Sequence, residues 1–326
     1  MKVTVLGTGA WGTALARLLS KGGHEVTLWG HDPNYLQEMA RTKRNERYLP
    51  GLELPHEWRY EANLSGATTG SACVIVAVPS KAFREVTREL SAYDGIVVSV
   101  TKGIEYETGL TMCGVLRETA PHARAVALSG PTLALEVARG IPTAIVAASQ
   151  DAAAAQTAQE IFHRPAFRVY SGSDPLGVEL GGALKNVVAI AAGVGDGLGF
   201  GDNSKAALIT RGIVEIRRLG VACGAQAETF AGLSGLGDLT VTCYSRLSRN
   251  RGLGEKLGRG EKLESILANA VAVAEGYPTA RSAYKLAQKL KVTTPIIDEV
   301  YALLYEGKNP AQAVQDLTHR ESKAED

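Results

Sequence analysis

Lys185 and Asn186 lie in a segment, residues 178–189, whose other members are mostly apolar or small. An ammonium group in such surroundings is costly unless it is paired or its pKa is lowered. A lysine with a lowered pKa can give and take a proton during carbonyl reduction. The glycines at 181 and 182, one turn earlier, allow another backbone to come close. We therefore predict that Lys185 is an acid–base catalyst; the alternative is an aliphatic stem whose head reaches solvent.

Asp238 follows the sequence Gly-Leu-Gly at 235–237, which predicts a carboxylate in a glycine-bracketed loop. Such a carboxylate could orient an ammonium group or accept a hydrogen bond from a substrate hydroxyl. The structural alternative is a turn aspartate or a helix N-cap.

Residues 245–251, Ser-Arg-Leu-Ser-Arg-Asn-Arg, gather hydroxyl, guanidinium and amide groups in one short stretch. Arginine forks match the geometry of phosphate, so Ser248, Arg249 and Asn250 are candidates to bind a phosphorylated substrate. A solvated helix face is the alternative. Binding to RNA is disfavoured because the surroundings are neutral or acidic.

Residues 7–12 read Gly-Thr-Gly-Ala-Trp-Gly, directly after a strand at 2–6 and before a helix at 13–20. In this context Gly7 permits the tight turn, Gly9 lets the backbone approach a pyrophosphate, and Gly12 allows close packing of helix on strand. The helix N-terminus adds N–H groups and positive partial charge. We predict a nicotinamide dinucleotide site; the alternative is a related fold that has lost its ligand.

The second strand ends at Trp-Gly-His, 29–31, where a typical NAD site has an acid for the ribose 2′-hydroxyl. Asp32 comes slightly late and precedes Pro33, so it is a candidate N-cap as well as a ribose ligand. His31 and the basic residues 41, 43 and 44 could accept a 2′-phosphate, or could form a solvated helix end. These residues favour NADP over NAD as the cofactor.

Three further strand ends are candidate site positions, because ligands of doubly wound sheets bind beyond the carboxyl ends of the strands. Lys102 in Thr-Lys-Gly, 101–103, places a cation where a phosphate would lie. Residues 129–132, Ser-Gly-Pro-Thr, offer backbone N–H groups and a hydroxyl. Residues 78–80, Val-Pro-Ser, form either a nicotinamide contact or a simple turn.

The elements that position these residues change character along the chain. Short β-branched runs predict strands at 2–6, 25–29, 73–78, 96–100, 125–128, 143–147 and 167–170. Helical periodicity follows at 176–192, 204–219, 255–267 and 279–290, with Asp174 as N-cap and Pro175 at the first helical position. We predict an α/β protein: a Rossmann-like, doubly wound, mainly parallel sheet in residues 1–172, and an all-helical substrate and catalytic domain in residues 173–326.

Composition sets broad limits on function. The 326 residues are 45% hydrophobic and 21% charged with a formal charge of +1, so we expect an ordinary folded protein without affinity for nucleic acid. Because a strand-like run begins at Lys2, we expect no export signal. The apolar stretch 181–201 contains Lys185, Asn186 and Asp196, which favours a buried helix over a membrane span. Four scattered cysteines without ligand spacing indicate reduced thiols, no metal site and a cytoplasmic location.

Together these motifs resemble the NAD(P)-dependent glycerol-3-phosphate dehydrogenase family of bacteria. The landmarks, in chain order, are GTGAWGTA at 7–14, WGH at 29–31, YLPG at 48–51, TKG at 101–103, SGPT at 129–132, ELGGALKN at 179–186, GFGDNSKAA at 199–207 and SRN at 248–250. They cover nearly the whole chain. Ala10 departs from the serine that many family members have, which removes a hydroxyl but leaves a backbone contact possible.

The resemblance implies site residues and an activity. It implies that Lys185 exchanges the proton with the substrate oxygen on C2, helped by Asp238. Cofactor contacts are implied for Ala10, Trp11, His31, Lys102, Ala134, Arg249, Val273 and Glu275, and substrate contacts for Lys102, Gly130, Thr132, Lys185, Asp238, Ser248, Arg249 and Asn250. The implied substrates are dihydroxyacetone phosphate and glycerol 3-phosphate, the implied assembly a homodimer, and the implied role the supply of glycerol 3-phosphate for phospholipid synthesis.

Two other functions are consistent with the residues alone. A β-hydroxyacid or ketopantoate-type reductase has the same domain order but takes a carboxylate substrate, which the Ser-Arg-Asn group disfavours. A non-catalytic nicotinamide sensor would bind the dinucleotide without turnover, which the presence of Lys102, Lys185 and Asp238 disfavours.

Overall fold

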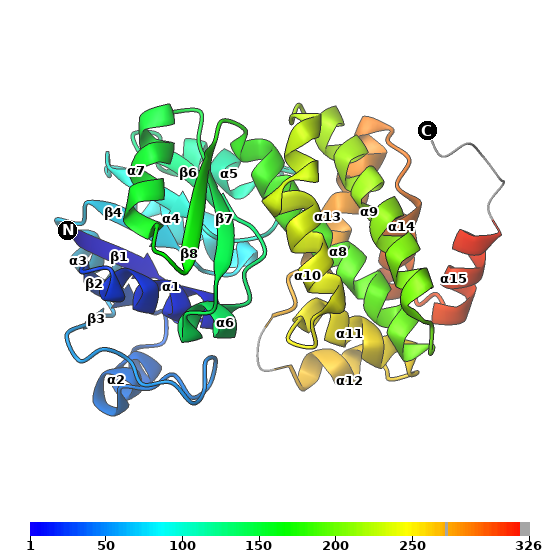
Figure 1. Ribbon diagram of the computed structural model, residues 1–326, viewed down its shortest axis with the longest axis horizontal. Helices are drawn as coiled ribbons and strands as arrows, with labels where there is room; N and C mark the ends of the chain where they lie inside the picture. The colour runs from blue at the N-terminus through cyan, green and yellow to red at the C-terminus, as the bar shows by residue number, and fades with distance from the viewer. Residues whose placement is uncertain (271–272, 320–326) are drawn as a thin grey trace.

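The computed structural model describes residues 1–270 and 273–319 (Figure 1). Eight strands form one sheet in the order β3-β2-β1-β4-β5-β6-β7-β8, and only the β6–β7 pair is antiparallel. The strands are β1 (Lys2–Leu6), β2 (Glu25–Trp29), β3 (Arg59–Glu61), β4 (Cys73–Val76), β5 (Ile96–Ser99), β6 (Arg124–Ser129), β7 (Thr143–Ala148) and β8 (Phe167–Gly172). The predicted mainly parallel sheet is confirmed.

Helices cover both faces of the sheet. They are α1 (Ala10–Lys21), α2 (Pro33–Thr42), α3 (Leu64–Thr68), α4 (Ser80–Arg88), α5 (Met112–Thr119), α6 (Ala134–Arg139) and α7 (Ala152–Phe162). Cys73 and Ile75 of β4 pack with buried side chains of α1 and α7, whereas Val74 and Val76 pack with those of α4 and α5. Since successive strand residues point to opposite faces, both faces are apolar at the centre of the sheet, where β4 and β5 are buried along their whole length.

The rest of the described chain is helical. It contains α8 (Pro175–Gly197), α9 (Asp202–Ala222), the short turns η1 (Ala227–Ala231) and η2 (Leu233–Gly237), α10 (Asp238–Tyr244), α11 (Arg249–Gly258), α12 (Leu263–Ala268), α13 (Gly276–Leu290), α14 (Pro295–Tyr305) and α15 (Pro310–Thr318). Helix α8 begins as expected: the Asp174 carboxylate accepts the Gly177 N–H at 2.9 Å, and Pro175 stands at the first position. The predicted α/β fold class with a C-terminal helical part is therefore confirmed.

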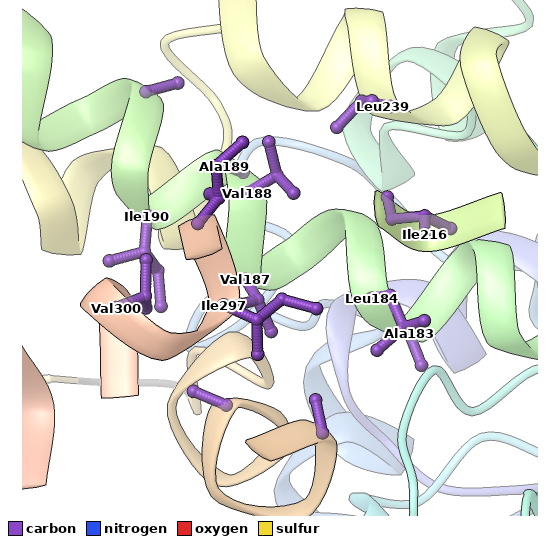
Figure 2. Close-up of a cluster of buried hydrophobic side chains, with 14 of the residues drawn as sticks. Ala183, Leu184, Val187, Val188, Ala189, Ile190, Ile216, Leu239, Ile297 and Val300 are labelled. Atoms are coloured by element: carbon purple, nitrogen blue, oxygen red, sulfur yellow. The ribbon is translucent and has the colours of Figure 1, made fainter. Parts of the chain in front are cut away.

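Helix α8 is the centre of this helical part. Figure 2 shows apolar side chains of this helix packed against Ile216 of α9, Leu239 of α10, and Ile297 and Val300 of α14. The labelled residues of α8 are Ala183, Leu184, Val187, Val188, Ala189 and Ile190. By length and composition it could cross a membrane, but 94% of its apolar window is buried inside the molecule. It is the buried helix that the sequence predicts.

Two predictions about elements are wrong. The helix expected over 255–267 is divided into α11 and α12, because the chain leaves α11 after Gly258 and turns at Gly260 with φ of +88°. The sequence also fails to predict β3, whose three residues pair only with β2 at the edge of the sheet.

Hydrogen bonds tie the helical part to the carboxyl ends of the strands. The Glu179 carboxylate on α8 accepts the Cys113 N–H at the start of α5 at 2.9 Å. The Ser282 hydroxyl on α13 donates to the Ile104 carbonyl at 2.9 Å. These contacts hold the helices over the carboxyl ends of the strands, where the candidate site residues lie.

Candidate active site

A buried carboxylate holds two lysines that come from distant parts of the chain. The ammonium of Lys185, on α8, donates to Asp238 Oδ1 at 2.6 Å, and that of Lys102, just after β5, donates to Asp238 Oδ2 at 2.6 Å. Lys185 also donates to the Thr242 hydroxyl at 2.6 Å. Asp238 is only 1% exposed and Lys185 only 6%. The two cations thus share one acceptor in a place from which most water is excluded.

These surroundings adjust the acidity of Lys185. Burial disfavours the ammonium and is the largest influence; the charge of Asp238 opposes it, and the charge of Lys102 adds to it. Together they lower the pKa of Lys185 to about 8. A group with this pKa can both give and take a proton near neutral pH, which general acid–base catalysis requires.

Lys102 joins this centre to two neighbouring strand ends. Its ammonium also donates to the Gly130 carbonyl at 3.1 Å and lies 3.5 Å from the Thr132 hydroxyl, in the segment that follows β6. Thr132 in turn donates to the Gly130 carbonyl at 3.0 Å. The segments after β5 and β6, α8 and α10 therefore meet around one group of polar atoms.

The glycine pair on α8 lets η2 and the end of β6 pack closely against this helix, as the sequence predicts. A Cβ on Gly181 would lie 2.7 Å from the Ser234 carbonyl oxygen, and one on Gly182 would lie 2.4 Å from the Ser129 hydroxyl. A side chain at Gly181 would push the backbone of η2 away from Lys185, and one at Gly182 would displace the Ser129 hydroxyl.

The predicted phosphate-binding group lies at the start of α11. The Ser248 hydroxyl caps this helix by accepting the Arg251 N–H at 3.2 Å. Asn250 is buried, donates to Asn186 Oδ1 at 2.8 Å and accepts the Gly276 N–H at 2.9 Å. Asn186 is the neighbour of Lys185, so this pair of amides links the start of α11 to the lysine centre.

Glu275 bridges the helical part and the sheet. Its carboxylate accepts hydrogen bonds from the Ser80 backbone N–H at 3.1 Å and the Ser80 hydroxyl at 2.7 Å, at the start of α4. Burial raises the pKa of the Glu275 carboxyl, whereas the hydrogen bonds from Ser80 and the positive charge of Arg249, whose side chain is exposed, oppose that shift. A Cβ on Gly103 would lie 2.5 Å from Ser80 Cβ, so the glycine after Lys102 keeps this junction open. Nearby in sequence, Val273 is exposed.

The glycine loop has the geometry expected of a dinucleotide loop. Gly7 has φ of +124°, and a Cβ there would lie 2.5 Å from the Ala77 carbonyl oxygen. A Cβ on Gly12 would lie 2.1 Å from the Gly7 carbonyl oxygen, whereas one on Gly9 would meet no atom within 4 Å. The loop is closely packed at its first and third glycines and has open space at its second.

Three more predicted cofactor residues lie beside this loop. Ala10, Trp11 and Ala134 pack against one buried cluster formed by Ala14, Leu49 and Ala138. The indole Nε1 of Trp11 is buried without a hydrogen-bond partner among the residues that the structure describes. A ligand that supplied an acceptor here would satisfy it.

Asp32 serves as a helix cap. Its carboxylate accepts the N–H groups of Asn34 and Tyr35, each at 3.1 Å, while His31 beside it is exposed. In the basic group, Lys43 donates to the His56 carbonyl at 3.4 Å and lies over the Tyr60 ring, and Arg44 pairs with Glu46 at 3.2 Å. Among the residues that the structure describes, His31 makes no hydrogen bond or ion pair of the kind that engages Lys43 and Arg44.

The structure corrects the setting of Asp238 and adds one residue. Asp238 is the first residue of α10, not part of a loop, because η2 runs directly into that helix. Thr242, one turn later, accepts from Lys185 and donates to the Asp238 carbonyl at 2.6 Å. The sequence analysis missed Thr242, although its spacing of four residues from Asp238 fits one helix face.

Comparisons with known proteins agree with this arrangement. Residues 2–155 match the family profile described as NAD-dependent glycerol-3-phosphate dehydrogenase N-terminus, and residues 174–315 match the C-terminus of the same family. A glycerol-3-phosphate dehydrogenase [NAD(P)+] from Syntrophotalea carbinolica is 50% identical over 100% of this chain and 99% of that protein.

The chain belongs to the NAD-dependent glycerol-3-phosphate dehydrogenase family. Among solved structures, the family member from Coxiella burnetii has a TM-score of 0.95 and 37% identity, covering 98% of this chain and 99% of that one. A ketopantoate reductase from Ralstonia eutropha has a TM-score of 0.61 at 16% identity, covering 98% of this chain and 100% of that one, which shows a shared fold only.

Proposed function

We propose that this chain is an sn-glycerol-3-phosphate dehydrogenase that uses NAD or NADP and interconverts dihydroxyacetone phosphate and glycerol 3-phosphate. The observation that carries the proposal is the buried ammonium of Lys185, which is held 2.6 Å from Asp238 with its pKa lowered to about 8. Family membership supports the substrate, and the polar group at the start of α11 supports a phosphorylated one.

The residues present fit a nicotinamide dinucleotide. The glycine loop would hold the pyrophosphate at the start of α1, because Gly9 has open space and a helix N-terminus favours an anion. The unpartnered indole N–H of Trp11 fits an acceptor on the ligand. We assign cofactor contacts to Gly7, Gly9, Ala10, Trp11, Gly12, His31, Lys102, Ala134, Arg249, Val273 and Glu275.

The chain's own residues would bind and protonate the substrate. Ser248, Arg249 and Asn250 would hold the phosphate, and Lys102, Gly130 and Thr132 would position the three-carbon chain against Lys185. When bound, the reduced nicotinamide supplies the hydride that goes to C2. Lys185 then gives its proton to the forming alkoxide on C2, and its positive charge stabilises that oxygen as the charge develops. Asp238 and Thr242 keep the ammonium aimed at one place.

The direct test is the initial rate at which purified protein oxidises NADPH and, separately, NADH, followed by absorbance with and without dihydroxyacetone phosphate. Oxidation that depends on this substrate is expected. Ketopantoate and a three-carbon keto acid are the controls for a carboxylate-directed reductase. Folded protein that binds NADPH but oxidises it with none of these substrates would contradict the proposal and favour a nicotinamide sensor.

The same assay tests the weak preference for NADP. His31 is exposed at the end of β2, and Asp32 is occupied as a helix cap, so no carboxylate is committed to a ribose 2′-hydroxyl there. A higher kcat/KM with NADPH than with NADH is expected, and replacing His31 by Asp should reverse the order.

The pH dependence follows from the lowered pKa of Lys185. Reduction of the ketone needs the ammonium, so kcat should fall as the pH rises through about 8. Oxidation of glycerol 3-phosphate needs the neutral amine, so kcat in that direction should rise through the same pH. Rates in both directions at saturating cofactor would check this; two profiles that share the same slope would contradict the role of Lys185.

Several broader features are part of the proposal. We assign cofactor binding to residues 1–172 and catalysis to residues 173–326, with the reaction at their junction. The family and the buried character of α8 support a cytoplasmic enzyme that supplies glycerol 3-phosphate to phospholipid synthesis.

We also propose a homodimer, as the family resemblance implies. A largely apolar cavity of about 890 Å³ between α8, α9, α14 and α15, lined by none of the predicted site residues, is the face we would test as its interface. Ala207, exposed at its edge on α9, is a suitable probe. Ala207→Glu should convert a dimer into a monomer in sedimentation analysis, whereas Ala153→Glu on the exposed side of α7 should leave the mass unchanged. A monomeric wild-type protein would contradict the dimer.

A further inference from the structure

Asn45 is a buried side chain whose every hydrogen-bonding position is engaged. It is 0% exposed. Its amide nitrogen donates to the Thr8 carbonyl at 2.8 Å and to the Thr13 hydroxyl at 2.7 Å. Its amide oxygen accepts from the Tyr35 hydroxyl at 2.6 Å and from the Tyr48 backbone N–H at 3.1 Å. A carboxamide has two N–H donors and two acceptor lone pairs, so its orientation here is fixed.

The partners on the donor side belong to the glycine loop. The Thr8 carbonyl, between Gly7 and Gly9, also accepts from the Thr13 hydroxyl at 3.3 Å. In a trans peptide the carbonyl and the following N–H point in opposite directions. Because Asn45 holds the Thr8 carbonyl, the N–H of Gly9 is turned to the other side of the loop. Open space lies at Gly9, where an added Cβ would meet no atom within 4 Å.

The partners on the acceptor side belong to the region after β2. Tyr35 lies in the first turn of α2, where its backbone N–H donates to the Asp32 cap, and its ring meets that of Tyr48 edge-on at 5.8 Å. The Arg47 guanidinium lies over both rings. Asn45 thus connects the glycine loop to the segment that contains α2 and the turn after it. Both flank the place predicted for the adenosine half of a dinucleotide.

We propose that Asn45 is a positioning residue for the dinucleotide: it keeps the N–H of Gly9 turned towards the pyrophosphate, and so sets the affinity for NAD(P)H without touching the reacting atoms. This inference rests on the proposed function in that it requires the chain to bind a nicotinamide dinucleotide. It does not depend on which substrate is reduced.

The test is Asn45→Asp, which keeps the shape and the acceptor oxygen but places a second oxygen against the Thr8 carbonyl. The Kd for NADPH, measured by quenching of tryptophan fluorescence without substrate, should rise by about tenfold to a hundredfold. At saturating NADPH, kcat and the KM for dihydroxyacetone phosphate should stay within about twofold of the wild-type values. A purely structural defect would lower the folded fraction, and with it the amplitude of the quenching and the apparent kcat, without raising the Kd of the molecules that remain folded.

Two further variants, one test and one control, keep the inference testable if Asn45→Asp does not fold. Thr13→Val removes only the hydroxyl shared by Asn45 and the Thr8 carbonyl, and should raise the Kd by about threefold to tenfold with the melting temperature largely kept. Tyr35→Phe removes one bond on the acceptor side and should change the Kd by less than about threefold.

Wild-type affinity in both Asn45→Asp and Thr13→Val would overturn the inference, as would losses that match the unfolded fraction. Because binding is measured without substrate, wild-type protein that binds NADPH but reduces no dihydroxyacetone phosphate would count against the proposed function alone.

Discussion

Replacing Lys185 by methionine is expected to lower kcat for dihydroxyacetone phosphate reduction by about a thousandfold, because the variant loses both the proton donor and the charge beside the forming alkoxide. Methionine has nearly the same length as the lysine stem, so the packing of α8 should survive. The Kd for NADPH should stay within about twofold of the wild-type value, since Lys185 contacts Asp238 and Thr242 and not the glycine loop. Stopped-flow single turnovers would measure the chemical step directly.

A matched control for this variant is Lys308→Met. Lys308 is also an ion-paired lysine of the helical part, bound to Glu299 at 2.5 Å and to Asp316 at 2.6 Å, and it is none of the predicted site residues. Its loss should reduce stability slightly and leave turnover close to normal. Turnover of Lys185→Met within about tenfold of the wild type would remove Lys185 from the mechanism.

Asp238→Asn is expected to lower kcat by about a hundredfold and to move the titration of Lys185 to lower pH. The carboxylate is the main influence that raises the pKa of Lys185 against burial. Without its charge the ammonium is less stable, so the reduction rate should begin to fall at a pH well below about 8. The loss of a buried carboxylate between two lysines should also lower the melting temperature. The pH profile of kcat and a thermal melt measure these two effects.

Thr242→Val separates charge from hydrogen bonding in this test. It removes the uncharged partner of Lys185 and leaves the carboxylate in place. A smaller loss of kcat, about tenfold, is expected with the pH profile nearly unchanged. An Asp238→Asn profile that still falls at the wild-type pH would show that the carboxylate does not control the lysine.

Local sequence patterns predict much of this architecture. The alternation of apolar β-branched runs with helical periodicity predicted seven of the strands and α8, because each pattern reflects burial within one element. Asp174 before Pro175 predicted the start of α8 for the same reason, since a cap involves only neighbouring residues. The glycine loop is also local: Gly7 and Gly12 are required by a single turn and by the strand beside it.

The sequence also placed individual residues of the site, through strand ends and motifs. Lys102, Gly130 and Thr132 follow strands, and a parallel sheet brings the carboxyl ends of its strands together. Lys185 was predicted as a site residue because a charged residue in an apolar helix needs a partner. Asp238 was named beside Lys185 only through the family resemblance, since nothing in the sequence itself indicates which carboxylate meets which lysine.

Tertiary structure decided those pairings. Asp238 lies 53 residues from Lys185 and 136 from Lys102 along the chain, and Glu275 lies 195 residues from Ser80. Hydrogen bonds over such separations leave no periodic or local signal, because they arise only when packed helices meet the edge of the sheet. Asn45 was missed for the same reason: its role depends on burial beneath the glycine loop. The sequence by itself determined the elements and the candidate groups, and the packing of α8 and α10 against the strand ends determined which groups act together.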